Sequence, residues 1–201
     1  MKSYKLIALS ALVIALSHGC TTQPVKETPE QKPSYPVSGW GSGRDLMAYD
    51  ALVLYGRDLI ASKPTDIYEW CPSYTPAKAI RFYVALASAL TKFESNWKSS
   101  VTYTEDFADV KGKPVISRGL AQISIESANS YGCGITDAKQ LHDDKTNLEC
   151  LVRIWNRWIP KDGVIQGGKP KAWLGASRYH SPFRKPERIA SMKQQLKGVC
   201  Q

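Results

Sequence analysis

The sequence has no apolar run long enough to cross a membrane. The run at residues 6–16 holds 11 residues and is interrupted only by Ser10, whereas a bilayer-spanning helix needs about 20. Lys2 and Lys5 precede it, and a short apolar run after a positive start is typical of a secretory signal. We therefore expect residues 1–19 to be a signal peptide and the protein to be exported.

The end of this segment resembles a bacterial lipobox. Ser17, His18 and Gly19 precede Cys20, so we expect Cys20 to be lipidated and to become the new N-terminus. The protein would then be anchored in the cell envelope and face the periplasm. Thr21 after the cysteine favours the outer membrane. Ordinary signal cleavage nearby, with the protein exported and not lipidated, is the alternative.

The sequence also lacks the cysteine and histidine spacings of a structural zinc site, so we expect no metal and no cofactor. Five cysteines are present, and four remain if Cys20 carries the lipid. An even number in an exported chain favours two disulfides. We expect the pairs Cys133–Cys150 and Cys71–Cys200; four free thiols are the alternative.

No nucleic-acid-binding motif, internal repeat or long block of one charge is present. Lys and Arg total 27 against 18 Asp and Glu, a net charge of +9, which suits an anionic partner. Because the basic residues are scattered and the chain is exported, we expect a cell-wall polymer and not a nucleic acid. The length of 201 residues and the 43% hydrophobic content fit one globular domain, which we expect to be monomeric.

Residues 20–43 contain four prolines among polar residues and predict an extended tether before a folded domain at 44–201. β-branched and aromatic residues with a Lys-Gly-Lys-Pro turn predict a hairpin within 101–116. We expect a mostly helical α+β fold with a small β-hairpin lobe. Helical periodicity or helix-end residues mark the remaining segments: 46–60, 76–97, 124–132, 148–158, 171–179 and 186–198.

Glu94 is the first candidate catalytic residue. An apolar stripe reaches it in steps of three and four, through Ile80, Val84, Ala87 and Leu90. A carboxyl group on such an inward face is withdrawn from water, holds its proton more tightly and can serve as a general acid. The alternative is a glutamate at a helix end, solvated or paired with a basic residue.

The segment 117–123, Ser-Arg-Gly-Leu-Ala-Gln-Ile, is the second candidate feature. Gly119 would let the backbone approach a ligand closely. Gln122 offers a donor and an acceptor to sugar hydroxyls or an acetamido group. Taken alone, the segment is equally well explained as a loop before a helix.

Three segments in this order resemble the catalytic domain of lytic transglycosylases and goose-type lysozymes: 93–97 (Phe-Glu-Ser-Asn-Trp), 117–123, and 143–148 (Asp-Asp-Lys-Thr-Asn-Leu). The resemblance covers about residues 77–182. Ala121 stands where the family has Met, and Tyr179-His180-Ser181-Pro182 stands where it has Tyr-Asn-Ala-Gly. The resemblance implies a lysozyme-like domain that acts on peptidoglycan glycan strands, with Glu94 catalytic. It also implies a set of substrate-contacting residues: Ser117, Gly119, Gln122, Tyr179 and His180.

His180 is expected at the rim of the cleft, since no partner cluster for a metal is apparent. Basic residues gather late in the chain, and they could meet the carboxylates of muramic acid and stem peptides or form a solvated face: Arg178, Arg184, Lys185 and Arg188.

The resemblance implies cleavage of the β-1,4 bond between N-acetylmuramic acid and N-acetylglucosamine. We first expect a lytic transglycosylase, in which Glu94 acts as acid and then base and the substrate's own 6-hydroxyl forms a 1,6-anhydro end. The alternative is a lysozyme that uses water and a second carboxylate, from Glu105, Asp106 or Asp109, unless these form only a solvated acidic hairpin. Such an acidic lobe could equally favour deacetylated, amine-bearing sugars. A hypothesis of another class is a peptidoglycan-binding lipoprotein without catalysis.

Overall fold

The computed structural model describes residues 40–199. The predicted signal peptide, the tether as far as residue 39, the lipidation site Cys20 and the half-cystine Cys200 lie outside the described residues.

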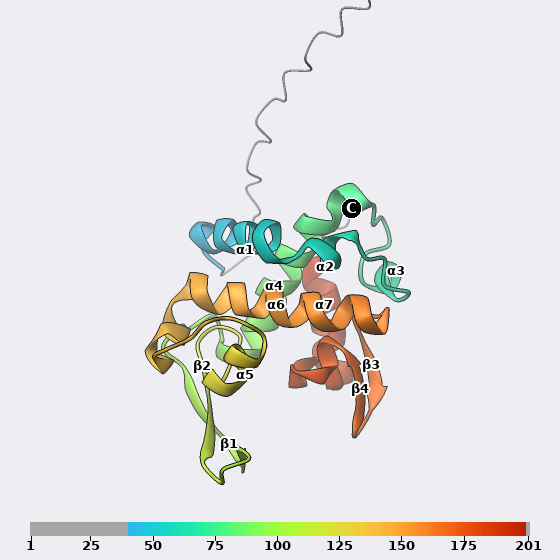
Figure 1. The fold of residues 1–201 in the computed structure, drawn as a ribbon. Coiled ribbons are helices and arrows are strands. Elements are labelled where there is room, and N and C mark those ends of the chain that lie inside the picture. The colour runs from blue at the N-terminus through green and yellow to red at the C-terminus, as the bar shows by residue number, and fades with distance from the viewer. Residues whose placement is uncertain (1–39, 200–201) are drawn as a thin grey trace, which may run out of the picture. The chain divides into compact units, whose positions relative to one another are not determined.

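Within the described residues the chain forms a mostly helical α+β fold with small antiparallel hairpins, which confirms the predicted fold class (Figure 1). The longer elements are α1 (Ser42–Tyr55), α4 (Ala79–Ser95), α6 (Asp144–Asp162) and α7 (Pro186–Leu196). The shorter helices are α2 (Arg57–Ala61), α3 (Ile67–Trp70) and α5 (Ile125–Ser130), and the strands are β1 (Thr102–Ala108), β2 (Pro114–Arg118), β3 (Gln166–Lys169) and β4 (Ala172–Gly175).

Helix α4 is the centre of the core. It packs against α1 and α7, while α1 also packs along α6. Every residue of α4 from Phe82 to Thr91 is buried, because apolar side chains occur all round the helix and neighbours cover each face. The core also takes in Trp40, which is fully buried and lies four residues before the predicted start at Arg44.

Local signals explain where several helices begin and end. Ser124 caps α5 as predicted, with its side chain accepting a hydrogen bond from the backbone N–H of Ser127 at 3.2 Å. The helix expected over 46–60 is divided at Gly56, where an added Cβ would lie 2.7 Å from the Leu52 carbonyl oxygen. Helix α4 ends at Asn96, which adopts a left-handed conformation with φ 50°.

The predicted first hairpin is present as β1 and β2, but the helix expected over 171–179 is wrong. Residues 166–175 instead form a second hairpin, β3–β4, followed by a 3₁₀ turn. Pro170 and Lys171 form the two-residue turn between the paired residues Lys169 and Ala172. Within β3, Gly168 has φ 87°, and its added Cβ would lie 2.2 Å from the Ala172 carbonyl oxygen, so only glycine fits there. Lys171 also has a positive φ, 68°, which a helix does not accommodate.

A disulfide between Cys133 and Cys150 joins the chain after α5 to α6. Cys71 is also disulfide-bonded, and its predicted partner Cys200 lies outside the described residues. Among residues 40–199, no helix is both long and apolar enough to span a membrane.

Asp45, in the first turn of α1, is only 5% exposed, and its Oδ1 has no hydrogen-bond partner among the described residues. Burial raises the pKa of this carboxyl well above its usual value, to about 6. The folded state therefore binds the proton more tightly than the unfolded state. This site contributes less stability as the pH rises through the range from about 4 to about 6.

Asp45→Asn removes this penalty. We expect its free energy of unfolding to exceed that of the wild type at pH 7 by at most about 3 kcal/mol, and the difference to shrink toward pH 4. Denaturant titrations of both proteins at several pH values measure it. Glu187→Gln, at an exposed position, is the control. An Asp45→Asn difference that does not change with pH would contradict the assignment.

Candidate active site

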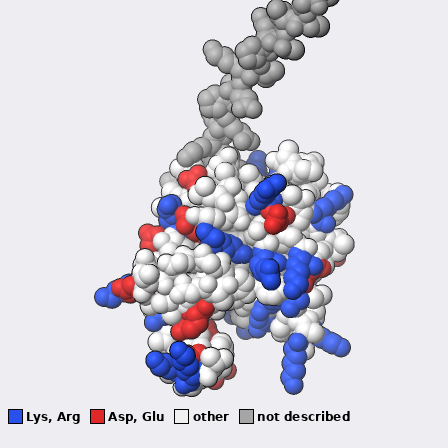
Figure 2. Space-filling view, viewed as in Figure 1, with Lys and Arg blue, Asp and Glu red and all other residues white. Residues whose placement is uncertain are grey.

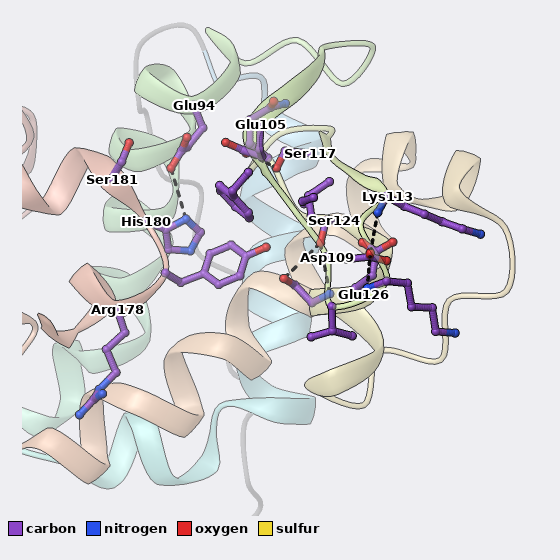
Figure 3. A pocket seen from close by; sticks show the side chains of 18 of the residues that line it. Glu94, Glu105, Asp109, Lys113, Ser117, Ser124, Glu126, Arg178, His180 and Ser181 are labelled. Atoms are coloured by element: carbon purple, nitrogen blue, oxygen red, sulfur yellow. Dashed lines mark hydrogen bonds and ion pairs between the residues drawn. The ribbon is translucent and has the colours of Figure 1, made fainter. Parts of the chain in front are cut away.

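A cleft of about 830 Å³ lies between the end of α4, the β1–β2 hairpin, the loop before α5 and residues 178–184 (Figure 3). Most of the residues predicted from the sequence line it: Glu94, Glu105, Asp109, Ser117, Gln122, Tyr179 and His180. Gly119 and Asp106 do not.

Glu94 projects into the cleft from the last turn of α4, and its side chain is 14% exposed. Of the predicted stripe, Val84, Ala87 and Leu90 are buried and Ile80 is half-buried. Every residue from Phe82 to Thr91 is buried as well, so the stripe is not a distinct face of this helix. Arg184, also in the cleft wall, is close enough to interact electrostatically with Glu94. Burial lowers the pKa of the Arg184 guanidinium, and the charge of Glu94 opposes that effect.

His180 is a buried partner of Glu94, so the expectation that it lies at the rim is wrong. Its side chain is 1% exposed, and its Nδ1 lies 3.3 Å from Oε1 of Glu94. The ring packs edge-on against Trp155, with centroids 6.3 Å apart. Its Nε2 has no partner among the described residues. The 3₁₀ turn after β4 places the residue here, because the His180 N–H donates to the Ala176 carbonyl oxygen at 2.9 Å.

Tyr179 lies beside His180 in the cleft wall. Its ring packs edge-on between His180 and Tyr131, with centroids 4.8 and 6.1 Å away. Burial raises the pKa of its hydroxyl to about 12, although hydrogen bonding at Ser127 and at the Ser124 backbone opposes the shift. The hydroxyl therefore stays protonated at neutral pH, and it can orient a substrate but not act as a base.

Asn147 of α6, which is fully buried, anchors the loop at 117–123 by hydrogen bonds. Its Nδ2 donates to the carbonyl oxygens of Leu141 and Arg118, at 2.8 and 3.0 Å. Its Oδ1 accepts from the Ala121 N–H at 2.8 Å. The sequence placed Asn147 in a motif without giving it a role.

Gly119 allows the loop to be held by Asn147, an arrangement that we call the clamp. It does not approach a ligand, so the role predicted for it is wrong. It has φ 73°, and an added Cβ would lie 2.0 Å from the Leu141 carbonyl oxygen and 2.4 Å from Nδ2 of Asn147. The glycine therefore allows the loop to sit directly on Asn147, away from the cleft.

Gln122 retains only part of its predicted hydrogen-bonding capacity. Its Nε2 donates to the Gly119 carbonyl oxygen at 2.7 Å, so the amide is turned back onto the loop. The side chain lines the cleft, but its Oε1 is buried and has no partner among the described residues. The amide therefore serves mainly to hold the loop.

The three candidate second carboxylates have different positions. Glu105 is half-buried in the cleft and accepts a hydrogen bond from the Ser117 hydroxyl at 2.5 Å. Asp106 is exposed outside the cleft. Asp109 accepts from the N–H groups of Lys111 and Lys113, both at 2.8 Å, and thereby shapes the hairpin turn. Hydrogen bonding from the Lys113 backbone is the main cause that lowers the pKa of Asp109; desolvation opposes it, and hydrogen bonding from the Lys111 backbone adds to the lowering.

Strand pairing accounts for the position of Glu105. Tyr103 pairs with Ser117, and Glu105, two residues after Tyr103, lies on the same face of the hairpin as Ser117. The register shifts between Thr104 and Ala108, where the segment on β1 is longer than the one on β2. Within residues 40–199, no three carboxylate, imidazole or thiol groups gather in a way that could hold a metal ion.

The sequence matches no family model and no curated protein. It is similar, however, to the solved structure of wild-type Bd0314 DslA in form 2, with 39% identity and a TM-score of 0.73 over 80% of this chain and 92% of that chain. The chain belongs to the DslA family. Two further DslA structures, each a variant with glutamine in place of one glutamate, match over the same shares of both chains. Both are 38% identical, with TM-scores of 0.74 and 0.73.

Gly119→Ala tests the clamp in this DslA-family fold. Because the new methyl group meets backbone and amide atoms that cannot retreat, we expect the free energy of unfolding to fall by more than about 2 kcal/mol. Gly134→Ala is the matched control: Gly134 has a similar φ of 68° with nothing within 4 Å of an added Cβ. It should cost only the left-handed strain, about 1 kcal/mol. Equal losses in the two variants would contradict the clamp.

Proposed function

We propose that the protein cleaves the β-1,4 bond between N-acetylmuramic acid and N-acetylglucosamine in peptidoglycan glycan strands. The observation that carries the proposal is the pair of carboxylates in one cleft, Glu94 from α4 and Glu105 from the bulged β1. Most glycosidases use two carboxyl groups that flank the scissile bond of the bound sugar chain. The motifs shared with lytic transglycosylases and goose-type lysozymes support the same substrate.

The two carboxylates suit different tasks. Glu94 is largely enclosed and backed by buried His180, which fits a general acid that protonates the leaving glycosidic oxygen. Glu105 stands on the opposing lobe, and the Ser117 hydroxyl orients it. It fits the group that activates water or stabilises the positive charge developing on the sugar. Tyr179 and Gln122 line the same cleft and would contact the bound sugars.

The position of Glu105 favours hydrolysis over the transglycosylase reaction that the motifs first suggested. A 6-hydroxyl attack needs no second carboxylate, and a hydrolytic reaction does. The DslA variants add support, because their two substituted glutamates are eleven residues apart, the same separation as Glu94 and Glu105. We therefore propose a lysozyme, with the lytic transglycosylase as second candidate on the strength of its motifs.

The proposed setting is the periplasmic face of the outer membrane, reached through a lipid on Cys20. The proposed working form is a monomer that needs no cofactor. Cys20 lies outside the described residues, and its role rests on the lipobox resemblance. Radiolabelled palmitate incorporated by the wild type and not by Cys20→Ala would support the anchor.

The reaction is tested by digesting purified peptidoglycan and identifying the sugar ends by mass spectrometry. We expect reducing muramic ends from the wild type, and Glu94→Gln and Glu105→Gln to be slower by about 10² to 10⁴-fold. Asp106→Asn, an adjacent change outside the cleft, should keep nearly full activity and is the matched control.

Other outcomes would redirect the assignment. Anhydro ends that persist in Glu105→Gln would indicate the transglycosylase and remove any required role for Glu105. Both acetylated and deacetylated walls are needed as substrates, because the acidic lobe could favour amine-bearing sugars. Binding to both without any product would leave a peptidoglycan-binding lipoprotein.

His180 acts in this proposal as a positioning residue for Glu94. His180→Phe keeps a buried ring but loses the nitrogen near Oε1 of Glu94. We expect kcat to fall by roughly 10 to 100-fold, with KM and the melting temperature little changed. His180→Gln, which keeps a donor, should retain more activity. A lower melting temperature with unchanged kcat would show that His180 contributes to packing and does not position Glu94.

A further inference from the structure

A second concavity, also of about 830 Å³, lies on the other side of the cleft wall. It is formed by α2, the second half of α6 and the chain at the end of α5. Its charged lining residues are Asp58, Arg153, Arg157 and Lys161, and its aromatic ones are Tyr55, Tyr131 and Trp158. We call it the α6 groove. Figure 2 shows Lys and Arg side chains gathering over the same part of α6.

The cations of the α6 groove are held by rings and not by carboxylates. The Arg153 guanidinium lies 3.7 Å from the centre of the Tyr55 ring. Lys161 and Arg157 lie over Trp158, at 4.9 and 5.8 Å. The side chains of these three cations make no hydrogen bond or ion pair with any residue in 40–199.

Stacking leaves the donors of these cations available. A guanidinium above a ring uses its flat face, so its N–H groups point sideways. Such N–H groups match the two oxygens of a carboxylate. The α6 groove is therefore preorganised for anionic groups carried on a partly apolar chain.

The α6 groove shares a wall with the catalytic cleft. Nε1 of Trp158 donates to the Tyr131 hydroxyl at 2.7 Å, and Tyr131 packs edge-on against Tyr179 of the cleft. Arg178 lines the cleft and lies 4.5 Å from the centre of the Trp158 ring. Its Nε and Nη2 donate to Asp162 at 2.6 and 2.9 Å, so Arg178 is part of the wall and is not available to bind an anion.

We propose that the α6 groove binds the carboxylate-bearing stem peptide of the glycan strand held in the neighbouring cleft. The proposal rests on the proposed function, because each muramic acid carries such a peptide, and the shared wall puts the groove beside the sugar chain. Asp58 at the edge of the groove suits the free amine of a diamino acid in that peptide. A flat anionic membrane would not use a concavity with a carboxylate in it.

The test measures binding apart from cleavage. The full chain in detergent is titrated calorimetrically with the free peptide alanyl-glutamyl-diaminopimelate, in the Glu94→Gln background and in the wild type. We expect Arg157→Glu with Lys161→Glu to weaken binding by at least about ten-fold, while cleavage of peptide-free glycan strands is unchanged. The matched control with the same change of charge is Lys139→Glu with Lys169→Glu, at exposed positions outside both concavities.

Each outcome separates this proposal from the proposed function. Peptide binding that depends on the groove in a protein that cleaves no wall would refute the enzyme and support the groove. Equal peptide affinity in the groove variant and the wild type would overturn the groove assignment, whether or not the protein is active. Groove-dependent binding to phosphatidylglycerol vesicles without binding to the peptide would also overturn it, in favour of a membrane contact.

Discussion

The side-chain amide of Asn147 holds the loop on which the cleft is built. It is fully buried, and three hydrogen bonds satisfy it, two to carbonyl oxygens and one from a backbone N–H. An unpaired amide at such a position would be costly, so the loop has little freedom to leave it. Gly119 allows the close approach, and the same loop then carries Ser117 and Gln122 to the cleft. The cleft therefore depends on a residue that does not line it.

The two walls of the cleft differ in local stability. Glu94 belongs to a helix buried almost throughout its length, and His180 supports it from within the core. Glu105 belongs to a two-stranded hairpin in which most of β1 is exposed. Fewer buried contacts mean lower local stability. In the proposed reaction, Glu94 on the enclosed wall protonates the leaving oxygen, and Glu105 on the exposed lobe acts on the side from which water attacks.

An aromatic wall of Tyr179, Tyr131 and Trp158 separates the cleft from the α6 groove. Arg178, fixed by Asp162, closes it on the outer side. Rings in edge-on contact and a paired guanidinium form a stiff partition. The proposed substrate is branched, with sugars in the cleft and a charged peptide in the α6 groove, and would use both concavities.

Periodicity and local turn residues were enough to predict the helical character of the chain and the first hairpin. They predicted Glu94 on an inward face, but α4 is buried on all sides from Phe82 to Thr91, so its place in the cleft depends on where the helix ends. The sequence did not predict the hairpin at 166–175, where positive φ values break an apparent helix. The three acidic neighbours were distinguished by contacts that lie outside the local pattern: Glu105 accepts from Ser117 in the cleft, Asp109 accepts from N–H groups of the hairpin turn, and Asp106 is outside the cleft. His180 shows the same limit. Its burial depends on contacts with Trp155 and with Glu94, 86 residues away in the chain, and a local pattern carries no information about such contacts.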